Sequence, residues 1–320
     1  MGNRITIPDT GLQLSRIGLG TVGAGIDWDG AEADKIFDTY LDLGGNVIDS
    51  AHVYSDWIPP ETARSERVIG DWLERSKKRN KVVLITKGGH PVMTGESPDT
   101  HISRMTKEDM AQDLEASLKQ LRTDYIDIYF YHRDDVSQPV ELLVDVMQGF
   151  VKEGKIRQYG CSNWSAGRMK EADVYAKSKG YRGFAANQAL LNAGSKYMRP
   201  LADDTMAAAD EEMQQYHKET PSNLLMPYMG VCSGFFHIYT EKGKEAVKDS
   251  PYYTEKNLVM AERIQKLMEK YACTISQAVL GFFTQQEFAC VPLYGPQNAE
   301  QLKDAMKTLE IKFEKEDYKI

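Results

Sequence analysis

Eight short apolar runs that alternate with longer amphipathic stretches constrain the fold of this chain more than any other feature. The runs are bounded by Gly, Asn or Asp, and the stretches between them repeat apolar residues at helical spacing. We predict strands at residues 17–21, 46–49, 82–87, 125–132, 156–163, 184–188, 223–228 and 288–293. Eight βα units in 320 residues favour a closed parallel barrel over an open sheet. The predicted fold class is therefore α/β, a (β/α)8 TIM barrel that occupies residues 1–320 as a single domain.

Helices are predicted between these strands, with two of them after the seventh strand. Their ranges are 31–43, 65–77, 107–121, 140–151, 165–179, 206–217, 258–271 and 276–286. N-cap candidates are Thr106, either Asn163 or Ser165, and Thr274. Residues 4–7 and 12–15 flank Asp9-Thr10-Gly11 and predict an N-terminal β-hairpin that plugs the bottom of the barrel.

Three connections are longer than a βα unit needs, namely residues 90–105, 192–205 and 233–257. Their Pro, Gly, Asp and Ser content predicts ordered loops or short turns, with no further helix or strand. In a barrel all three emerge at the carboxyl ends of the strands, where active sites are built.

Charge and composition narrow the partners. The chain has 39 Lys and Arg against 47 Asp and Glu, a net charge of −8, which leaves no cationic surplus for nucleic acid. No apolar run is long enough to span a membrane, and the N-terminus lacks the apolar core of a secretory signal. The four cysteines have no zinc or redox spacing. We expect a cytoplasmic protein with a small-molecule substrate, no membrane or nucleic-acid partner and no metal; nothing in the sequence indicates an oligomeric state.

Polar residues end nearly every predicted strand. They are Asp49, Lys87, His132, Ser162 with Asn163, Gln188 and Tyr228. Side chains from different strands converge at this rim of a barrel, so the set indicates a site. Taken singly, each has a structural alternative: Lys87 as a surface lysine, Asp49 as a helix N-cap, His132 as a satisfied strand-end histidine.

Lys87 closes the apolar run 82–86, where an unpaired ammonium is costly, and Asp49 on the neighbouring strand is its natural partner. Tyr54 lies five residues beyond Asp49 and can fold back over the barrel mouth. We expect Lys87 to stabilise the phenolate of Tyr54 and so tune it as a general acid. A neutral His132 is suited to bind a substrate oxygen or relay a proton.

These motifs resemble the aldo-keto reductase family. The matching segments are Asn46-Val47-Ile48-Asp49-Ser50-Ala51 followed by Tyr54, Ser65-Glu66-Arg67-Val68-Ile69-Gly70, Ile85-Thr86-Lys87, Tyr131-His132-Arg133-Asp134 and Gly160-Cys161-Ser162-Asn163-Trp164. The resemblance implies an oxidoreductase that interconverts a carbonyl and an alcohol with NAD(P)H. It implies a catalytic tetrad with Tyr54 as proton donor, Lys87 and Asp49 tuning it, and His132 orienting the carbonyl.

The same resemblance implies the cofactor contacts. Ser162, Asn163 and Gln188 would hold the nicotinamide carboxamide, Tyr228 would stack on the ring, and Ser233 and Gly234 would approach the pyrophosphate. Thr21, Asp49, Gln297 and Gln301 complete the implied cofactor-binding set. No strand-linked G-x-G-x-x-G is present, so a Rossmann site is not indicated.

The C-terminal segment departs from the family pattern. Members that use NADP usually carry a cation for the 2′-phosphate after the eighth strand, whereas Pro296-Gln297-Asn298-Ala299 stand here. Ala305 replaces a common adenine-contacting Asn, and Lys303 is the one nearby cation able to substitute. A phosphate without a cationic partner loses charge-assisted hydrogen bonds. The resemblance thus implies NADP(H), while the residues leave NAD(H) open.

The substrate prediction is a hydroxylated carbonyl compound such as a carbohydrate. It rests on Trp28, Trp57, Trp164 and Arg133 around the mouth, since indole faces suit sugar rings and Arg suits hydroxyl or carboxylate groups. The alternative is that the tryptophans pack the loops. The alternative function is a non-catalytic nicotinamide-cofactor-binding regulatory module like channel β-subunits, which the complete tetrad disfavours. A carboxylate-dependent glycosidase or lyase is disfavoured because only Asp49 qualifies.

Overall fold

The computed structural model describes residues 4–95 and 98–320, and within them eight parallel strands form one sheet. They are β3 (Gly18–Gly20), β4 (Val47–Asp49), β5 (Val83–Gly88), β6 (Ile126–Tyr131), β7 (Ile156–Ser162), β8 (Ala186–Gln188), β9 (Leu224–Leu225) and β10 (Leu293–Tyr294). From β3 to β9 each strand pairs with the next, and β10 pairs with β3. Hydrogen bonds from Val291 N to Leu225 O (3.0 Å) and from Leu293 N to Pro227 O (2.8 Å) join the remaining edges. The sheet is a closed barrel, which confirms the predicted fold class.

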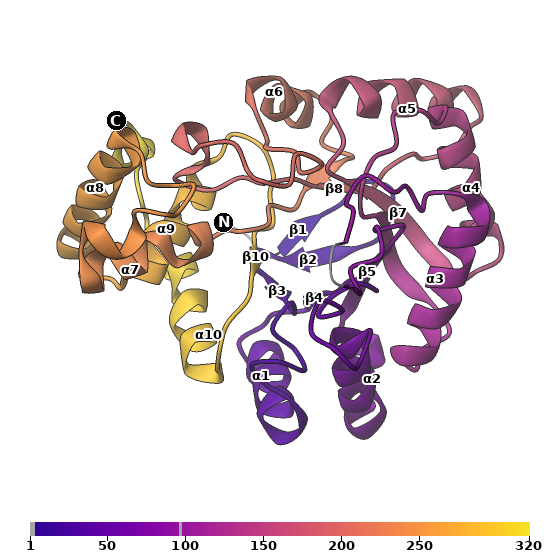
Figure 1. Cartoon of the computed structure of the whole chain (residues 1–320), viewed down its shortest axis with the longest axis horizontal. Coiled ribbons are helices and arrows are strands. Elements are labelled where there is room, and N and C mark those ends of the chain that lie inside the picture. The colour runs from indigo at the N-terminus through magenta and orange to yellow at the C-terminus, as the bar shows by residue number, and fades with distance from the viewer. Residues whose placement is uncertain (1–3, 96–97) are drawn as a thin grey trace.

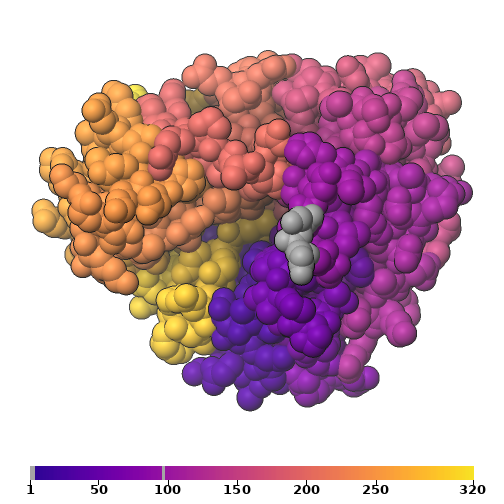
Figure 2. Space-filling model, in the orientation of Figure 1, coloured from indigo at the N-terminus to yellow at the C-terminus, as the bar shows by residue number. Residues whose placement is uncertain are grey.

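Helices surround the strands. They are α1 (Gly30–Asp42), α2 (Arg64–Ser76), α3 (Lys107–Gln120), α4 (Val140–Lys152), α5 (Ala166–Ser178), α6 (Glu211–Glu219), α7 (Phe235–Lys242), α8 (Glu255–Tyr271), α9 (Ile275–Leu280) and α10 (Ala299–Met306). In Figure 1, α1 and α2 lie below the strands, α3 to α5 lie to the right, α6 lies above, and α7 to α10 lie to the left. The same order is visible in space-filling form, where the orange and yellow C-terminal segments gather opposite the magenta helices (Figure 2).

Short 3-10 helices punctuate the connections. They are η1 (Arg79–Lys81), η2 (Ser195–Tyr197), η3 (Cys232–Gly234), η4 (Lys244–Val247), η5 (Gly281–Gln285), η6 (Lys307–Glu310) and η7 (Lys315–Tyr318). The predicted N-caps are present: Thr106, Ser165 and Thr274 each accept a backbone N–H of the third residue that follows. These caps satisfy donors that a helix start leaves unpaired, which fixes where α3, α5 and α9 begin.

The predicted loop over residues 233–257 is wrong, because it contains α7 and η4. Phe235 and Phe236 at the start of α7 are buried and pack in one cluster with Val247 and Tyr252. The segment therefore has an apolar face. Its glycines and charged residues are typical of a loop, which is why the helix was not predicted. α10 was also not among the predicted helices; it begins at an Asn298 cap.

The start of α6 and the extent of the eighth strand also differ from the prediction. α6 begins at residue 211 rather than 206, because Ala207 O and Ala209 N hydrogen-bond with Leu190 (2.9 and 2.8 Å) and hold that stretch extended. The eighth strand is confined to β10, whereas Phe288 and Cys290 pack as side chains of the core ahead of it.

The predicted N-terminal hairpin is present. β1 (Arg4–Thr6) and β2 (Gln13–Ser15) pair antiparallel, with Ile5 opposite Leu14. Ile7 and Leu14 are buried in a cluster with Val47, Val83 and other residues of the barrel strands. The hairpin thus closes the amino end of the barrel and leaves the carboxyl end for the site.

Candidate active site

The carboxyl ends of β4 and β5 bring three of the predicted residues into direct contact. Lys87 Nζ lies 2.8 Å from Asp49 Oδ2 and 2.9 Å from the Tyr54 hydroxyl. Its third donor bonds the Ser50 carbonyl at 2.7 Å. Lys87 and Asp49 are each 1% exposed, and Tyr54 is partly exposed at the mouth. Lys87 is thus a desolvated, fully bonded ammonium rather than a surface lysine.

Asp49 is held from two further strands. Gln188 Nε2 donates to Asp49 Oδ1 at 2.6 Å, and Thr21 N and Oγ1 donate to the Asp49 backbone carbonyl. The Thr21 hydroxyl is fully buried and also bonds Ser65 Oγ at 2.6 Å. Thr21 therefore positions Asp49, and its side chain has no surface to offer a ligand, contrary to the cofactor contact expected for it.

The segment that carries Tyr54 is fastened to β5. His52 N donates to Lys87 O at 3.0 Å, and Ser50 N donates to Ile85 O at 2.9 Å. The buried Glu66 carboxylate accepts from Thr86 Oγ1 at 2.6 Å and contacts His52 Nδ1 at 3.4 Å. Backbone and side-chain bonds therefore fix the loop on the same strand that supplies Lys87.

The electrostatics of the cluster differ in one respect from expectation. Burial raises the pKa of the Tyr54 phenol above its ordinary value, and the Lys87 ammonium only partly opposes this rise. Burial alone would lower the pKa of Lys87, but the Asp49 carboxylate holds it above its ordinary value. Tyr54 is therefore a neutral phenol, and Lys87 acts on it in the expected direction without outweighing burial.

His132 follows β6 and its ring lies edge-on to Tyr54, with 5.8 Å between ring centroids. Burial, with contributions from His90 and Arg133, holds the pKa of His132 well below its ordinary value, so the ring is neutral. Its Nδ1 is buried with no hydrogen-bond partner among the described residues. An unpaired lone pair is tolerated better than an unpaired N–H, which places the proton on Nε2 and makes that atom the donor.

His90 belongs to this site and was missed in the sequence. Its ring contacts His132 at 4.6 Å between centroids, and its Nδ1 lies 2.8 Å from Pro91 O. Burial and the charge of Arg133 lower the pKa of His90 to about 4. Its position directly after Lys87-Gly88-Gly89, where a chain leaving β5 turns across the rim, is the signal that identifies it.

Ser162, Asn163 and Tyr228 form a connected group at the ends of β7 and β9. Asn163 has φ +65°, and its Nδ2 donates to His132 O at 3.0 Å and to Ser162 Oγ at 3.1 Å. Its Oδ1 accepts from the Tyr228 hydroxyl at 2.6 Å and from Ala207 N at 3.0 Å. Asn163 thereby connects the end of β6, the end of β7 and the residues that follow β9. Gln188, at the end of β8, is bonded to Asp49.

The remaining cofactor candidates lie at two helix starts. Cys232, Ser233 and Gly234 all have positive φ, and no side chain caps the start of α7 that follows. Cys232 N and Gly234 N already donate to Met229 O (2.8 Å) and Val231 O (3.0 Å), so what this turn offers an anion is the dipole of α7. At α10, Gln301 N bonds the Asn298 cap, and Gln297 and Gln301 bond each other through N to Oε1 (2.9 Å) and Nε2 to Oε1 (3.2 Å). The start of α7 thus has no side-chain cap, whereas the α10 end presents neutral amides.

Two of the three tryptophans assigned to the substrate are core residues. Trp28 is 4% exposed, donates to Pro296 O at 3.0 Å and packs on Phe37. Trp164 is fully buried and stacks on Tyr131. Both indoles belong to the main hydrophobic core, so neither can face a sugar ring. Only Trp57, 44% exposed, keeps a face for a ligand.

Arg133 is engaged by its neighbours. Its Nη2 donates to Asp203 Oδ2 at 3.0 Å, its Nε donates to Thr205 Oγ1 at 2.8 Å, and its Nη1 donates to His132 O at 3.1 Å. The pairing with Asp203 was not foreseen, because 70 residues separate the two along the chain. The guanidinium is thus neutralised by the loop that follows β8.

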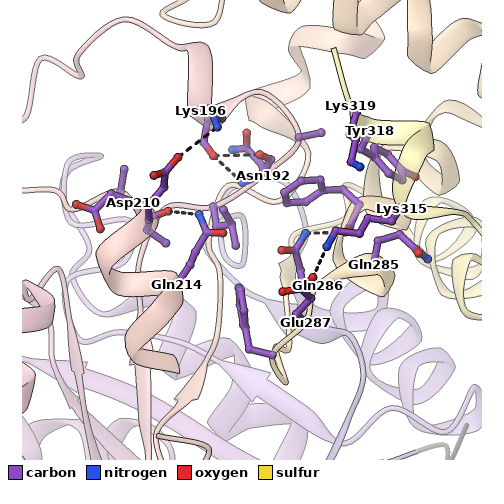
Figure 3. A pocket seen from close by; sticks show the side chains of 18 of the residues that line it. Asn192, Lys196, Asp210, Gln214, Gln285, Gln286, Glu287, Lys315, Tyr318 and Lys319 are labelled. Atoms are coloured by element: carbon purple, nitrogen blue, oxygen red, sulfur yellow. Dashed lines mark hydrogen bonds and ion pairs between the residues drawn. The ribbon is translucent and has the colours of Figure 1, made fainter. Parts of the chain in front are cut away.

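Two cavities are relevant to the site, and only one of them adjoins it. A cavity of about 440 Å³ adjoins it and is lined by Lys87, His90 and Arg104 among others. Another, of about 590 Å³, lies between the stretch after β8, α6 and the C-terminal segment, where Lys315 pairs with Glu287 (Figure 3). None of the tetrad residues lines the second cavity. Within residues 4–95 and 98–320 no cluster of three His, Cys, Asp or Glu could hold a metal, and no helix is long and apolar enough to cross a membrane.

A closed (β/α)8 barrel that gathers Tyr54, Lys87, Asp49 and His132 at its carboxyl rim has the fold of a nicotinamide-dependent carbonyl reductase. The model of the aldo/keto reductase family matches residues 16–320, so the chain belongs to that family. It is an oxidoreductase that interconverts a carbonyl and an alcohol with a nicotinamide cofactor.

Similar proteins span nearly the whole chain. The oxidoreductase YrpG of Bacillus subtilis is 27% identical over 310 residues, 96% of this chain and 91% of that protein. The NADP(+) aryl-alcohol dehydrogenase of Phanerodontia chrysosporium is 26% identical, over 97% of this chain and 82% of its own. Norsolorinic acid reductase A of Aspergillus parasiticus is 24% identical, over 96% and 76%.

Proposed function

We propose that Tyr54, Lys87, Asp49 and His132 carry the reduction of an aldehyde or ketone, with Tyr54 as the proton donor. The observation that carries this proposal is the direct contact of Lys87 Nζ with both Asp49 and the Tyr54 hydroxyl inside the barrel rim. A bound nicotinamide dinucleotide supplies the hydride. Side chains of this protein orient the carbonyl, donate the proton and stabilise the phenolate that remains.

Each of these side chains has one task. His132 donates from Nε2 to the substrate oxygen and orients the carbonyl toward the Tyr54 hydroxyl. As negative charge develops on that oxygen, Tyr54 gives it a proton, and the phenolate that remains is stabilised by Lys87 at 2.9 Å. Asp49 keeps Lys87 protonated and fixed in place. Because Tyr54 is neutral in the free protein, the acid is ready throughout the neutral pH range.

The cofactor is held, in this proposal, by Ser162, Asn163 and Gln188 at the carboxamide, Tyr228 at the ring, and Ser233 with Gly234 at the pyrophosphate. We further propose that NADH is accepted as well as NADPH. Gln297 and Gln301 offer a 2′-phosphate only neutral amides, and Lys303 Nζ is bonded to Glu300 Oε1 at 2.8 Å. Within residues 296–303, all of which the structure describes, Lys303 is the one cation, and a phosphate dianion would compete with Glu300 for it.

The substrate we propose is an uncharged aldehyde or ketone, including aromatic ones. Burial of Trp28 and Trp164 removes the main support for a carbohydrate, and two of the relatives are named for aryl alcohols and norsolorinic acid. Residues 1–320 are proposed to act as one domain in the cytoplasm.

The test is reduction of benzaldehyde with NADH and with NADPH, followed at the nicotinamide absorbance. Tyr54→Phe removes only the hydroxyl, so we expect kcat to fall by about 10²- to 10⁴-fold while cofactor affinity, measured by fluorescence titration, stays within about twofold. Unchanged kcat in the variant would refute the proton-donor assignment. Cofactor binding by the wild type without turnover of any aldehyde or ketone would favour the regulatory-module alternative.

A further inference from the structure

A charged pair borders the mouth of the barrel and has no part in the chemistry assigned above. Arg133 follows His132 directly, and its side chain is 12% exposed; its partner Asp203 is 25% exposed. Burial lowers the pKa values of His132 and His90 and raises that of Tyr228; the Arg133 charge adds to the first two shifts and opposes the third. The guanidinium therefore lies within electrostatic reach of the groups that surround the substrate.

Asp203 is built to hold Arg133. One carboxylate oxygen, Oδ1, accepts from Thr205 N at 3.0 Å and from Thr205 Oγ1 at 2.5 Å, while Oδ2 accepts from Arg133 Nη2 at 3.0 Å. Thr205 Oγ1 in turn accepts from Arg133 Nε at 2.8 Å. Burial alone would raise the pKa of Asp203, but its bonds from Thr205 and the charge of Arg133 hold it below the ordinary value. The carboxylate is therefore ionised and turned toward the arginine.

An arginine at the mouth of a reductase pocket would recruit carboxylate substrates by bidentate, charge-assisted hydrogen bonds. In this chain the carboxylate of Asp203 is bonded to Arg133, where a substrate carboxylate would otherwise bind. Resting on the proposed function, we propose that Asp203 is a specificity-determining residue: it occupies Arg133 as an internal carboxylate, so that the enzyme selects uncharged carbonyl compounds and discriminates against carbonyl compounds that carry a carboxylate.

The experiment compares one neutral and one anionic aldehyde on the same ring, benzaldehyde and 4-carboxybenzaldehyde, at low ionic strength. The measured quantity is the ratio of kcat/KM for the anionic to the neutral substrate. Asp203→Asn keeps an oxygen that can accept from Thr205 and removes the charge opposite Arg133. We expect this variant to raise the ratio by about tenfold, which corresponds to 1.4 kcal/mol, and high salt to shrink the gain.

Asp204→Asn is the matched control, because it makes the same charge change one residue along the loop. Asp204 is 75% exposed and pairs with the exposed His101. We expect it to change the ratio by less than about twofold, since exposed pairs and their fields are screened. The double variant Asp203→Asn/Arg133→Gln should return the ratio to the wild-type value, because the gain depends on the released guanidinium.

The outcomes separate this inference from the proposed function. If the wild type reduces benzaldehyde and Asp203→Asn leaves the ratio unchanged, or Asp204→Asn raises it equally, Asp203 does not set specificity. If the wild type reduces no carbonyl compound at all, the proposed function fails first. A wild-type enzyme that prefers 4-carboxybenzaldehyde would also overturn the inference.

Discussion

The rim around Lys87 and the start of α10 around Lys303 each contain a lysine paired with a carboxylate, and the two pairs behave oppositely. Lys87 and Asp49 are each 1% exposed, and Lys87 makes three hydrogen bonds. Lys303 and Glu300 lie one helical turn apart with side chains 45% and 72% exposed. A desolvated pair fixes a geometry and shifts neighbouring pKa values, whereas an exposed pair contributes little and rearranges easily. The Lys87–Asp49 pair is thus held in one geometry, whereas the Lys303–Glu300 pair can separate and Lys303 can take another partner.

Removing the buried lysine should give the largest effect. Lys87→Met leaves Asp49 as an uncompensated buried carboxylate, so we expect the free energy of unfolding to fall by about 3–5 kcal/mol. Reduction of benzaldehyde should be lost as well, because Tyr54 loses the cation that stabilises its phenolate. Urea denaturation and steady-state kinetics measure the two effects separately.

A double variant distinguishes the structural from the catalytic part. Lys87→Met/Asp49→Asn removes both charges, so most of the lost stability should return while activity stays absent. Recovered activity in the double variant would show that the ammonium is not needed for proton transfer. Stability that stays low would show that the cost of the single variant is packing rather than charge.

The contrast in burial also predicts a pH response. His90, at the reactive rim, has a pKa lowered to about 4 against about 6.5 in an unfolded chain. As the pH falls, the unfolded state therefore takes up the proton before the folded state does. The contribution of His90 to the free energy of unfolding is complete above pH 6.5 and declines as the pH falls toward 4. The loss is about 2 kcal/mol at pH 5. His132 acts in the same direction.

The measurement is the difference in unfolding free energy between pH 7.5 and pH 5. His90→Gln should reduce that difference by about 2 kcal/mol, whatever it does to stability at pH 7.5. Glu300→Gln, at the exposed end, should leave the difference unchanged. A His90→Gln protein with the full wild-type difference would mean that His90 is protonated in the folded state.

These two regions also differ in how well the sequence predicts them. Asp49, Lys87 and His132 end apolar strands in a fixed register, so their convergence follows from the strand pattern alone. The roles of Trp28 and Trp164 were wrong, because a strand pattern says which residues are near the rim but not which way a large indole turns. α7 and α10 were missed because each has only eight residues, which is too short a stretch for a helical repeat of apolar residues to be recognised with certainty. The Arg133–Asp203 contact depends on a loop path that no local pattern specifies.

The smallest predicted effect lies at α10 and tests whether that end is adaptable. Glu300→Gln removes the partner of Lys303 and leaves its ammonium free to meet a 2′-phosphate. We expect the dissociation constant for NADPH to fall by about two- to fivefold relative to that for NADH, the scale of an exposed ion pair. Fluorescence titration of both dinucleotides measures the ratio, and Glu310→Gln, an exposed residue with the same charge change, is the control. An equal shift for both cofactors would place Lys303 outside the reach of the phosphate, and a wild type that already strongly prefers NADPH would require a cation from another element.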